Sequence, residues 1–170
     1  RLAPQARVLD MGTGSGAIAV AIAHTRRDAQ VTALDVSPAA LDIARQNAVS
    51  NGARVRLVQS DWFAAIEGER FDMVVSNPPY IADGDVHLSQ GDLRFEPTGA
   101  LTDHADGLSA LRTIIKGAPA HLEPGGWLLM EHGYDQAAQV RELLSEQGYV
   151  DVASWRDLAG IERVTGGRAP

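Results

Sequence analysis

The chain has 170 residues, which is the length of one domain and enough to bury a hydrophobic core without disulfides. Hydrophobic residues make up 45% and cysteine is absent, which excludes a predominantly disordered chain, thiolate metal sites and cysteine nucleophiles. The net charge of −7 repels a phosphate backbone and disfavours a stand-alone nucleic-acid-binding protein.

The N-terminal end carries neither an initiator methionine nor an export signal. Arg1 is followed within a few residues by a strand pattern, so we expect a piece of a longer protein. No basic start precedes an apolar stretch, and no run of about 18 apolar residues occurs in the chain. We therefore expect a cytoplasmic protein without membrane contact.

Strand-like runs alternate with helical stretches, as in a parallel sheet covered by helices. The predicted strands are 7–11, 30–34, 55–59, 71–76, 127–131, 149–155 and 161–165, and the predicted helices are 17–23, 38–48, 108–120 and 136–147. The last two strands are joined by a connection too short for a parallel pair. The sequence thus predicts one α/β domain over residues 1–170, with a seven-stranded, mostly parallel sheet, helices on both faces and a C-terminal antiparallel hairpin.

Residues 81–105 hold neither a strand period nor a helix period. A loop of that length inside a compact domain is usually a lid or a binding segment. Open α/β sheets bind ligands at the carboxyl ends of their parallel strands, and the distinctive residue groups of this chain fall at those ends.

A glycine-rich turn, Gly12-x-Gly14-x-Gly16, follows the first predicted strand and precedes a helix. Such a turn lets a ligand approach the backbone and points amide N–H groups toward it. Asp35 ends the second strand, where its carboxylate can accept hydrogen bonds from both hydroxyls of a ribose. These features favour an adenosine-type ligand. A tight turn without any ligand remains the alternative.

Two further groups have two interpretations each. Asp10 precedes the turn, and it either faces a cationic amino group of the ligand or receives backbone N–H groups of the turn. Asp61 and Trp62 end the third strand, where the carboxylate can accept from the exocyclic amine of a nucleobase. The indole of Trp62 offers a flat apolar wall to that base, or serves as an ordinary core aromatic.

The segment Asn77-Pro78-Pro79-Tyr80 ends the fourth strand. The first proline keeps Asn77 extended, and both prolines fix φ and donate no N–H. The segment is therefore stiff and rich in acceptors, namely the side-chain carbonyl of Asn77 and the main-chain carbonyl of Pro78. Simple termination of a strand by two prolines is the alternative.

Rigid acceptors beside an aromatic ring suit chemistry on a planar NH2 group. Two acceptors that take the hydrogens favour a pyramidal nitrogen and free its lone pair, which is otherwise conjugated. The ring of Tyr80 can stack on the planar group and fix its angle. Holding reactants in attack geometry can contribute about 7–11 kcal/mol to catalysis.

These motifs resemble those of class I S-adenosylmethionine-dependent methyltransferases that modify planar nitrogen, and in particular the bacterial peptide chain release factor glutamine methyltransferases. The resemblance covers essentially the whole chain and departs from the family pattern at Thr102-Asp103-His104. The matching stretches are 10–16, Asp35, 60–62, 77–81, 95–97, 100–101, 106–108 and 156–163.

The resemblance implies a Rossmann-like sheet and methyl transfer from S-adenosylmethionine to the side-chain amide of the glutamine in a Gly-Gly-Gln loop of a release factor. It implies that the cofactor contacts Asp10, Gly12, Thr13, Gly14, Ser15, Gly16, Asp35, Asp61, Trp62 and Asn77. It implies that the substrate amide lies against Asn77, Pro78, Pro79 and Tyr80, with Asn77, Pro78 and Tyr80 as catalytic residues. Family members also carry an N-terminal docking domain, so we expect this chain to bind cofactor but to methylate intact release factor poorly.

Three other functions remain to be separated from this one. An adenine-N6 nucleic-acid methyltransferase would use the same acceptor segment, but it needs a basic groove and base flipping. A catalytically silent S-adenosylmethionine-binding module is of a different class, and an NAD-dependent oxidoreductase expects a different glycine spacing. The five histidines lack metal-ligand spacing, so we expect no metal, and we expect a monomer without direct nucleic-acid contact.

Overall fold

The computed structural model describes residues 2–80 and 107–170. The expected loop 81–105 and the stretches 95–97 and 100–101 of the family resemblance, with the departure at 102–104, lie outside the described residues. None of the helices among the described residues is long and apolar enough to cross a membrane.

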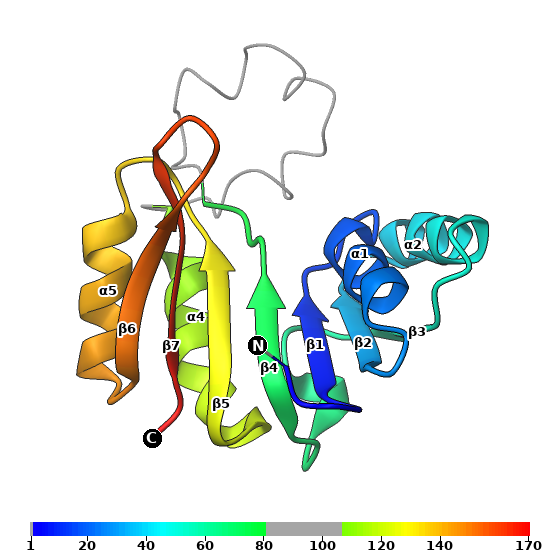
Figure 1. Ribbon diagram of the computed structural model, residues 1–170, viewed down its shortest axis with the longest axis horizontal. Coiled ribbons are helices and arrows are strands. Elements are labelled where there is room, and N and C mark those ends of the chain that lie inside the picture. The colour runs from blue at the N-terminus through cyan, green and yellow to red at the C-terminus, as the bar shows by residue number, and fades with distance from the viewer. Residues whose placement is uncertain (1, 81–106) are drawn as a thin grey trace.

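Seven strands form one sheet in the order β3-β2-β1-β4-β5-β7-β6 (Figure 1). The strands are β1 (Arg7–Met11), β2 (Gln30–Asp35), β3 (Val55–Gln59), β4 (Phe71–Ser76), β5 (Leu122–Glu131), β6 (Val150–Arg156) and β7 (Glu162–Arg168). The first five are parallel to one another, and β7 pairs antiparallel with both β5 and β6. The predicted α/β fold with a C-terminal antiparallel hairpin is therefore confirmed.

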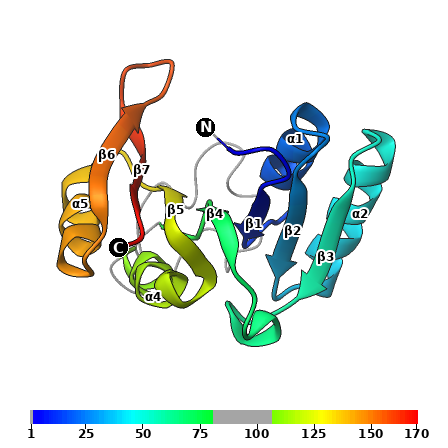
Figure 2. The same cartoon turned by 60° about the horizontal axis from the view of Figure 1, so that its bottom comes forward.

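Four α-helices cover the two faces of this sheet. The helices are α1 (Ala17–Thr25), α2 (Pro38–Ser50), α4 (Ser109–Gly117) and α5 (Ala137–Glu146), with short 3-10 helices η1 (Ala64–Ile66) and η4 (Ala118–His121). Helices α1 and α2 pack over β1 to β3, while α4 and α5 cover β5 to β7 on the opposite face (Figures 1 and 2). The crossovers are right-handed and run in opposite directions from the centre of the sheet, so the two pairs of helices lie on opposite faces.

The central strands are buried on both faces, which explains their continuous apolar sequences. In β1 the last four residues are buried, and in β4 only Asp72 is partly exposed. One core cluster joins the strands to α4 and α5, and a second joins them to α1. This packing holds the carboxyl ends of β1, β2 and β4 in fixed relative positions.

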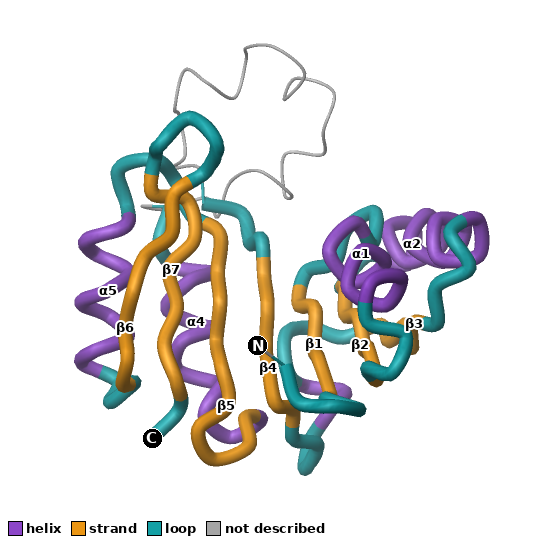
Figure 3. Tube along the Cα trace, in the orientation of Figure 1, coloured by secondary structure: helices purple, strands orange, loops and turns teal. Residues whose placement is uncertain are grey.

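Several element boundaries differ from the sequence expectation by one to five residues, and two of the differences have a clear physical reason. Strand β5 begins at Leu122 rather than 127, because Leu122 already pairs with Phe71 and the Gly125-Gly126 turn is accommodated as a shift of register within the strand. The helix expected to end at 120 ends at Gly117 and continues as η4, which has Pro119 in its first turn. Figure 3 shows both segments at the edge of the sheet opposite to the carboxyl end of β4.

Candidate active site

A cavity of about 630 Å³ opens where β1 and β4 diverge into connections that run to opposite sides, the switch point at which α/β sheets bind ligands. Its volume lies within the usual range for small-molecule sites. The residues that line it are Met11, Gly12, Thr13, Gly14, Ser15, Ala17, Ile18, Leu34, Asp35, Val36, Ser37, Ala40, Ser60, Asp61, Trp62, Asn77 and Pro79.

The glycine turn is shaped by three left-handed residues that serve two purposes. Gly12 and Gly14 have φ of +66° and +55°, and a Cβ on either would meet nothing within 4 Å. Gly16 has φ of +82°, and its Cβ would come within 3.0 Å of the Ala44 Cβ on α2. The first two glycines therefore leave open space beside the cavity, and the third allows two helices to approach closely.

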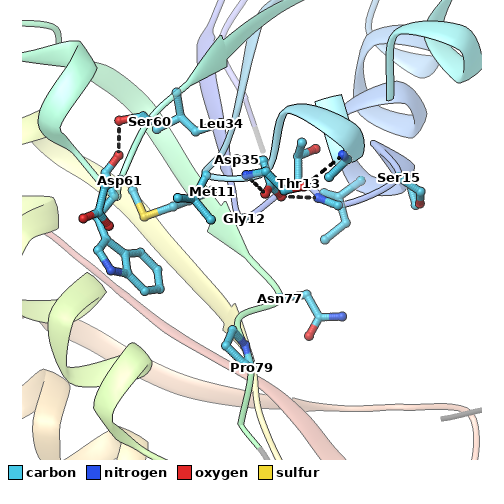
Figure 4. Close-up of a pocket in the computed structure, with 17 residues that line it drawn as sticks. Met11, Gly12, Thr13, Ser15, Leu34, Asp35, Ser60, Asp61, Asn77 and Pro79 are labelled. Carbon is cyan, nitrogen blue, oxygen red and sulfur yellow. Dashed lines mark hydrogen bonds between the residues drawn. The ribbon is translucent and has the colours of Figure 1, made fainter. Parts of the chain in front are cut away.

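Asp35 connects the end of β2 to this turn. Its Oδ2 accepts a hydrogen bond from the backbone N–H of Gly14 at 2.9 Å, and its Oδ1 accepts from the N–H of Ser37 at 2.9 Å. A carboxylate offers about four lone-pair sites, so acceptor capacity remains for ligand hydroxyls. Figure 4 shows Asp35 beside Gly12 and Thr13, within the cavity lining.

Asp10 lies beneath the turn, and its side chain is buried with the residue only 1% exposed. Its Oδ2 accepts from the Thr13 hydroxyl at 2.6 Å and from the Ala19 N–H at 3.0 Å, while its Oδ1 has no partner. Burial raises the pKa of Asp10 to about 6, and the two hydrogen bonds oppose that rise. Asp10 thus accepts one backbone N–H, that of Ala19 in α1, and from the turn itself it accepts the Thr13 hydroxyl rather than N–H groups. Contact with a ligand amino group stays a prediction, and Asp10 does not line the cavity.

The end of β3 supplies Asp61 and Trp62. Asp61 is exposed at the cavity, and Trp62 is half-buried with a left-handed φ of +48°. The hydroxyl of Ser60 donates to the Trp62 carbonyl at 2.7 Å and accepts from the Ala65 N–H at 3.0 Å, which stabilises this unusual backbone. Trp62 both lines the cavity and packs on the core, so its two interpretations are not exclusive.

The segment after β4 reaches the cavity from a different element, as Figure 4 shows for Asn77 and Pro79. Asn77 is exposed, and among the described residues no hydrogen bond of its side chain is present. Pro78 is buried, and Tyr80 is half-buried against the core with its hydroxyl donating to Glu131 Oε1 at 3.2 Å. The free Asn77 amide and the anchored Tyr80 fit a segment built to receive a polar group.

The structure therefore brings together residues from β1, β2, β3 and β4. Nine of the sequence-predicted residues line the cavity, and four do not, namely Asp10, Gly16, Pro78 and Tyr80. Sequence reasoning missed Ser76, whose hydroxyl donates to the Met11 carbonyl at 2.7 Å and joins the ends of β1 and β4. It also missed Glu131 and Gln136, because periodicity gives no signal for contacts across more than 50 residues.

Other polar groups serve the framework. His132 is fully buried, with Nε2 at 2.7 Å from the Thr165 hydroxyl and Nδ1 at 2.8 Å from the Gly133 carbonyl, and burial lowers its pKa. In the part of the chain that the structure describes, no three His, Asp or Glu side chains gather as metal ligands would.

Fold and site together define an α/β protein of the Rossmann-like class with its ligand cavity at the carboxyl edge of the sheet. Residues 2–93 match the family model described as Methyltransferase small domain. Since this match spans more than half of the chain, the protein belongs to the methyltransferase small domain family.

Sequence relatives carry a more particular name. A protein of Burkholderia pseudomallei named release factor glutamine methyltransferase is 61% identical over 170 residues, which covers 96% of this chain and 60% of the relative. One of Xylella fastidiosa with the same name is 59% identical over 169 residues and covers 99% and 62%, respectively. The chain thus spans about 60% of the length of these curated relatives.

Solved structures share the fold. A methyltransferase from Pyrococcus furiosus superimposes with a TM-score of 0.75 at 23% identity, covering 99% of this chain and 77% of the other. The Thermus thermophilus 16S rRNA N2 G1207 methyltransferase, solved with AdoMet and guanosine, gives a TM-score of 0.69 at 23% identity and covers 98% and 38%, respectively. At these identities the similarity establishes the fold.

Proposed function

We propose that this protein transfers a methyl group from S-adenosylmethionine to the side-chain amide nitrogen of the glutamine in the Gly-Gly-Gln loop of a peptide chain release factor. The observation that carries the proposal is the position of Asn77 and Pro79 at the cavity formed by the glycine turn, Asp35, Asp61 and Trp62. The names of the relatives, at 46–61% identity, support the same substrate.

The cavity residues fit the cofactor. The open space beside Gly12 and Gly14 admits the methionine end against the backbone of the glycine turn, although the N–H groups of Thr13, Gly14 and Gly16 already donate within the protein. The spare acceptor capacity of Asp35 suits the ribose hydroxyls, and Asp61 with Trp62 suits the adenine amine and ring. Asp10 stabilises the turn from below through Thr13 and Ala19.

The acceptor segment performs the activation. When bound, S-adenosylmethionine supplies an electrophilic methyl on sulfur, and transfer breaks the S–C bond as the N–C bond forms, with the amide proton released to water. The Asn77 side-chain carbonyl accepts one amide hydrogen of the substrate and the Pro78 main-chain carbonyl accepts the other. Tyr80 packs against the amide plane and holds its angle. Fixed acceptors of this kind lower the barrier because they need no reorganisation during the reaction.

The test uses methyl-labelled S-adenosylmethionine with a release factor and, separately, a DNA duplex. We expect label on the release factor only, and loss of that label in Asn77→Ala while cofactor binding largely survives. Label on DNA would instead support an adenine-N6 methyltransferase. Tight cofactor binding with no label on either substrate would support a silent binding module.

We also propose that residues 1–170 form the methyltransferase domain and that docking of an intact release factor uses an N-terminal domain beyond these residues. The greater length of the relatives supports this division. The turnover of this chain on intact release factor is compared with that of the complete Burkholderia pseudomallei relative. We expect slower turnover by this chain with similar cofactor affinity, and equal rates would refute the proposal. We further propose that the protein is a cytoplasmic monomer whose partner is the release factor.

A further inference from the structure

Gln136 is a buried side chain behind the proposed acceptor segment, and the residue is 9% exposed. It lies in the connection from β5 to α5, at the same end of the sheet as the end of β4 (Figure 1). Its Nε2 donates to the Tyr80 carbonyl at 3.1 Å and to the Gly107 carbonyl at 3.2 Å. One amide thus binds the two described residues that flank positions 81–106.

The orientation of this amide is fixed by its other end. The Oε1 of Gln136 accepts from the backbone N–H of Gly133 at 2.8 Å, so the amide nitrogen must face the two carbonyls. The main chain of Gln136 is also held, since its N–H donates to the Gly133 carbonyl at 3.1 Å and its carbonyl begins α5. Each hydrogen of the NH2 group therefore has one acceptor, and the side-chain carbonyl is used as well.

Through this contact Tyr80 is held at both ends. Gln136 binds its main-chain carbonyl, and Glu131 binds its hydroxyl at 3.2 Å. At the other end of the segment, Ser76 is bonded to the Met11 carbonyl at 2.7 Å. The φ angles of the two prolines between these hydrogen-bonded ends are fixed, so a shift at Tyr80 also moves the rest of the segment.

We propose that Gln136 is a positioning residue for methyl transfer, which sets the Asn77–Tyr80 segment at the distance and angle that the substrate amide requires. This inference rests on the proposed function and deepens it. Gln136 does not line the cavity, so it acts through Tyr80 rather than on the cofactor. Its removal therefore lowers the rate of transfer and leaves cofactor affinity intact.

The test uses two variants of Gln136 with matched controls at Gln139, in the helix that Gln136 precedes. Gln136→Glu keeps the acceptor for Gly133 and removes both N–H donors, while Gln136→Met removes all three bonds at similar length and without charge. The controls are Gln139→Glu and Gln139→Met, at an exposed position of α5. Measurements are kcat and KM for the release factor, the Kd for S-adenosylmethionine, and hydrogen exchange of the peptide over residues 74–80.

We expect both Gln136 variants to lower kcat about 10- to 100-fold, with cofactor Kd and release-factor KM within about threefold of the controls, because misplacement by about 1 Å costs that much. We also expect faster exchange at residues 74–80 in the Gln136 variants alone. An active wild type with Gln136 variants that match the controls would overturn the inference and leave the proposed function standing. A parallel loss of cofactor binding and thermal stability would also overturn it, since that reports a merely structural role.

If the wild-type protein methylates no release factor, the proposed function fails independently of Gln136. The exchange measurement then decides the positioning role alone. Unchanged exchange at residues 74–80 in both Gln136 variants would overturn it.

Discussion

The two halves of the cavity are positioned by different kinds of contact. The half built on β1 and β2 depends on local backbone geometry, since the glycine turn and Asp35 meet through main-chain N–H groups within about two dozen residues. The half built on β4 depends on side chains distant in sequence, with Tyr80 bonded to Glu131 and Gln136, 51 and 56 residues away. Cofactor binding and methyl acceptance can therefore be disturbed separately.

The largest expected effect comes from removing the acceptor in the β4 half. Asn77→Ala deletes the exposed side-chain carbonyl, and we expect transfer to the release factor to fall about 10²- to 10³-fold, as for loss of one fixed polar group in other active sites. Steady-state kinetics measure the rate of methyl transfer, and isothermal titration with S-adenosylmethionine measures cofactor affinity. Asn51→Ala, at the exposed end of α2, is the matched control and should retain full activity. A cofactor affinity that falls as far as the rate would remove the distinction between the halves.

In the β1 half, the buried Asp10 gives a pH-dependent stability. Its folded-state pKa is about 6 against an ordinary 3.8, so the unfolded chain releases its proton first as pH rises and the folded protein loses stability over that interval. The shift corresponds to about 3 kcal/mol. We expect Asp10→Asn, which cannot titrate, to gain about this free energy of unfolding relative to wild type between pH 4 and pH 7.

Urea unfolding across that pH range measures the difference. Thr13 and Ala19 keep an acceptor in the variant, because the Asn side-chain carbonyl can replace Asp10 Oδ2. Parallel pH profiles for the two proteins would contradict the assignment.

A substitution at Asp35 tests the proposed cofactor site directly. Asp35→Ala removes the acceptor offered to the ligand and also frees the N–H groups of Gly14 and Ser37. We expect the Kd for S-adenosylmethionine to rise about 30- to 100-fold, since hydrogen bonds to a charged group contribute about 1.5–3 kcal/mol. Asp42→Ala, exposed on α2, should leave the Kd unchanged. An unaltered Kd in Asp35→Ala would exclude Asp35 from the cofactor site.

The smallest expected effect is the crowding between α1 and α2 at Gly16. Gly16→Ala places a methyl within 3.0 Å of the Ala44 Cβ, whereas Gly52→Ala has the same left-handed backbone with nothing within 4 Å. Both lose about 1 kcal/mol or more from the backbone, and we expect Gly16→Ala to lose about 1–2 kcal/mol beyond Gly52→Ala through crowding. Thermal unfolding of both variants checks this. Equal losses would show that the helices do not crowd at Gly16.

The division between the halves also explains what could be predicted from the sequence. The alternation of apolar runs and the glycine turn predicted the sheet and the position of Asp35, because those signals lie within short stretches. Gln136 gave no such signal, since its role depends on hydrogen bonds to the carbonyls of Tyr80 and Gly107, which only the folded chain brings together. The early start of β5 was missed for the same reason, because a glycine pair indicates a turn until its pairing with β4 is known.

Tandem mass spectrometry after reaction with a release factor and S-adenosylmethionine locates the transferred methyl group most directly. We expect one methyl on the side-chain amide nitrogen of the glutamine in the Gly-Gly-Gln loop, and none when Asn77 is replaced by alanine. A methyl on any other residue, or an undiminished product with Asn77→Ala, would contradict it.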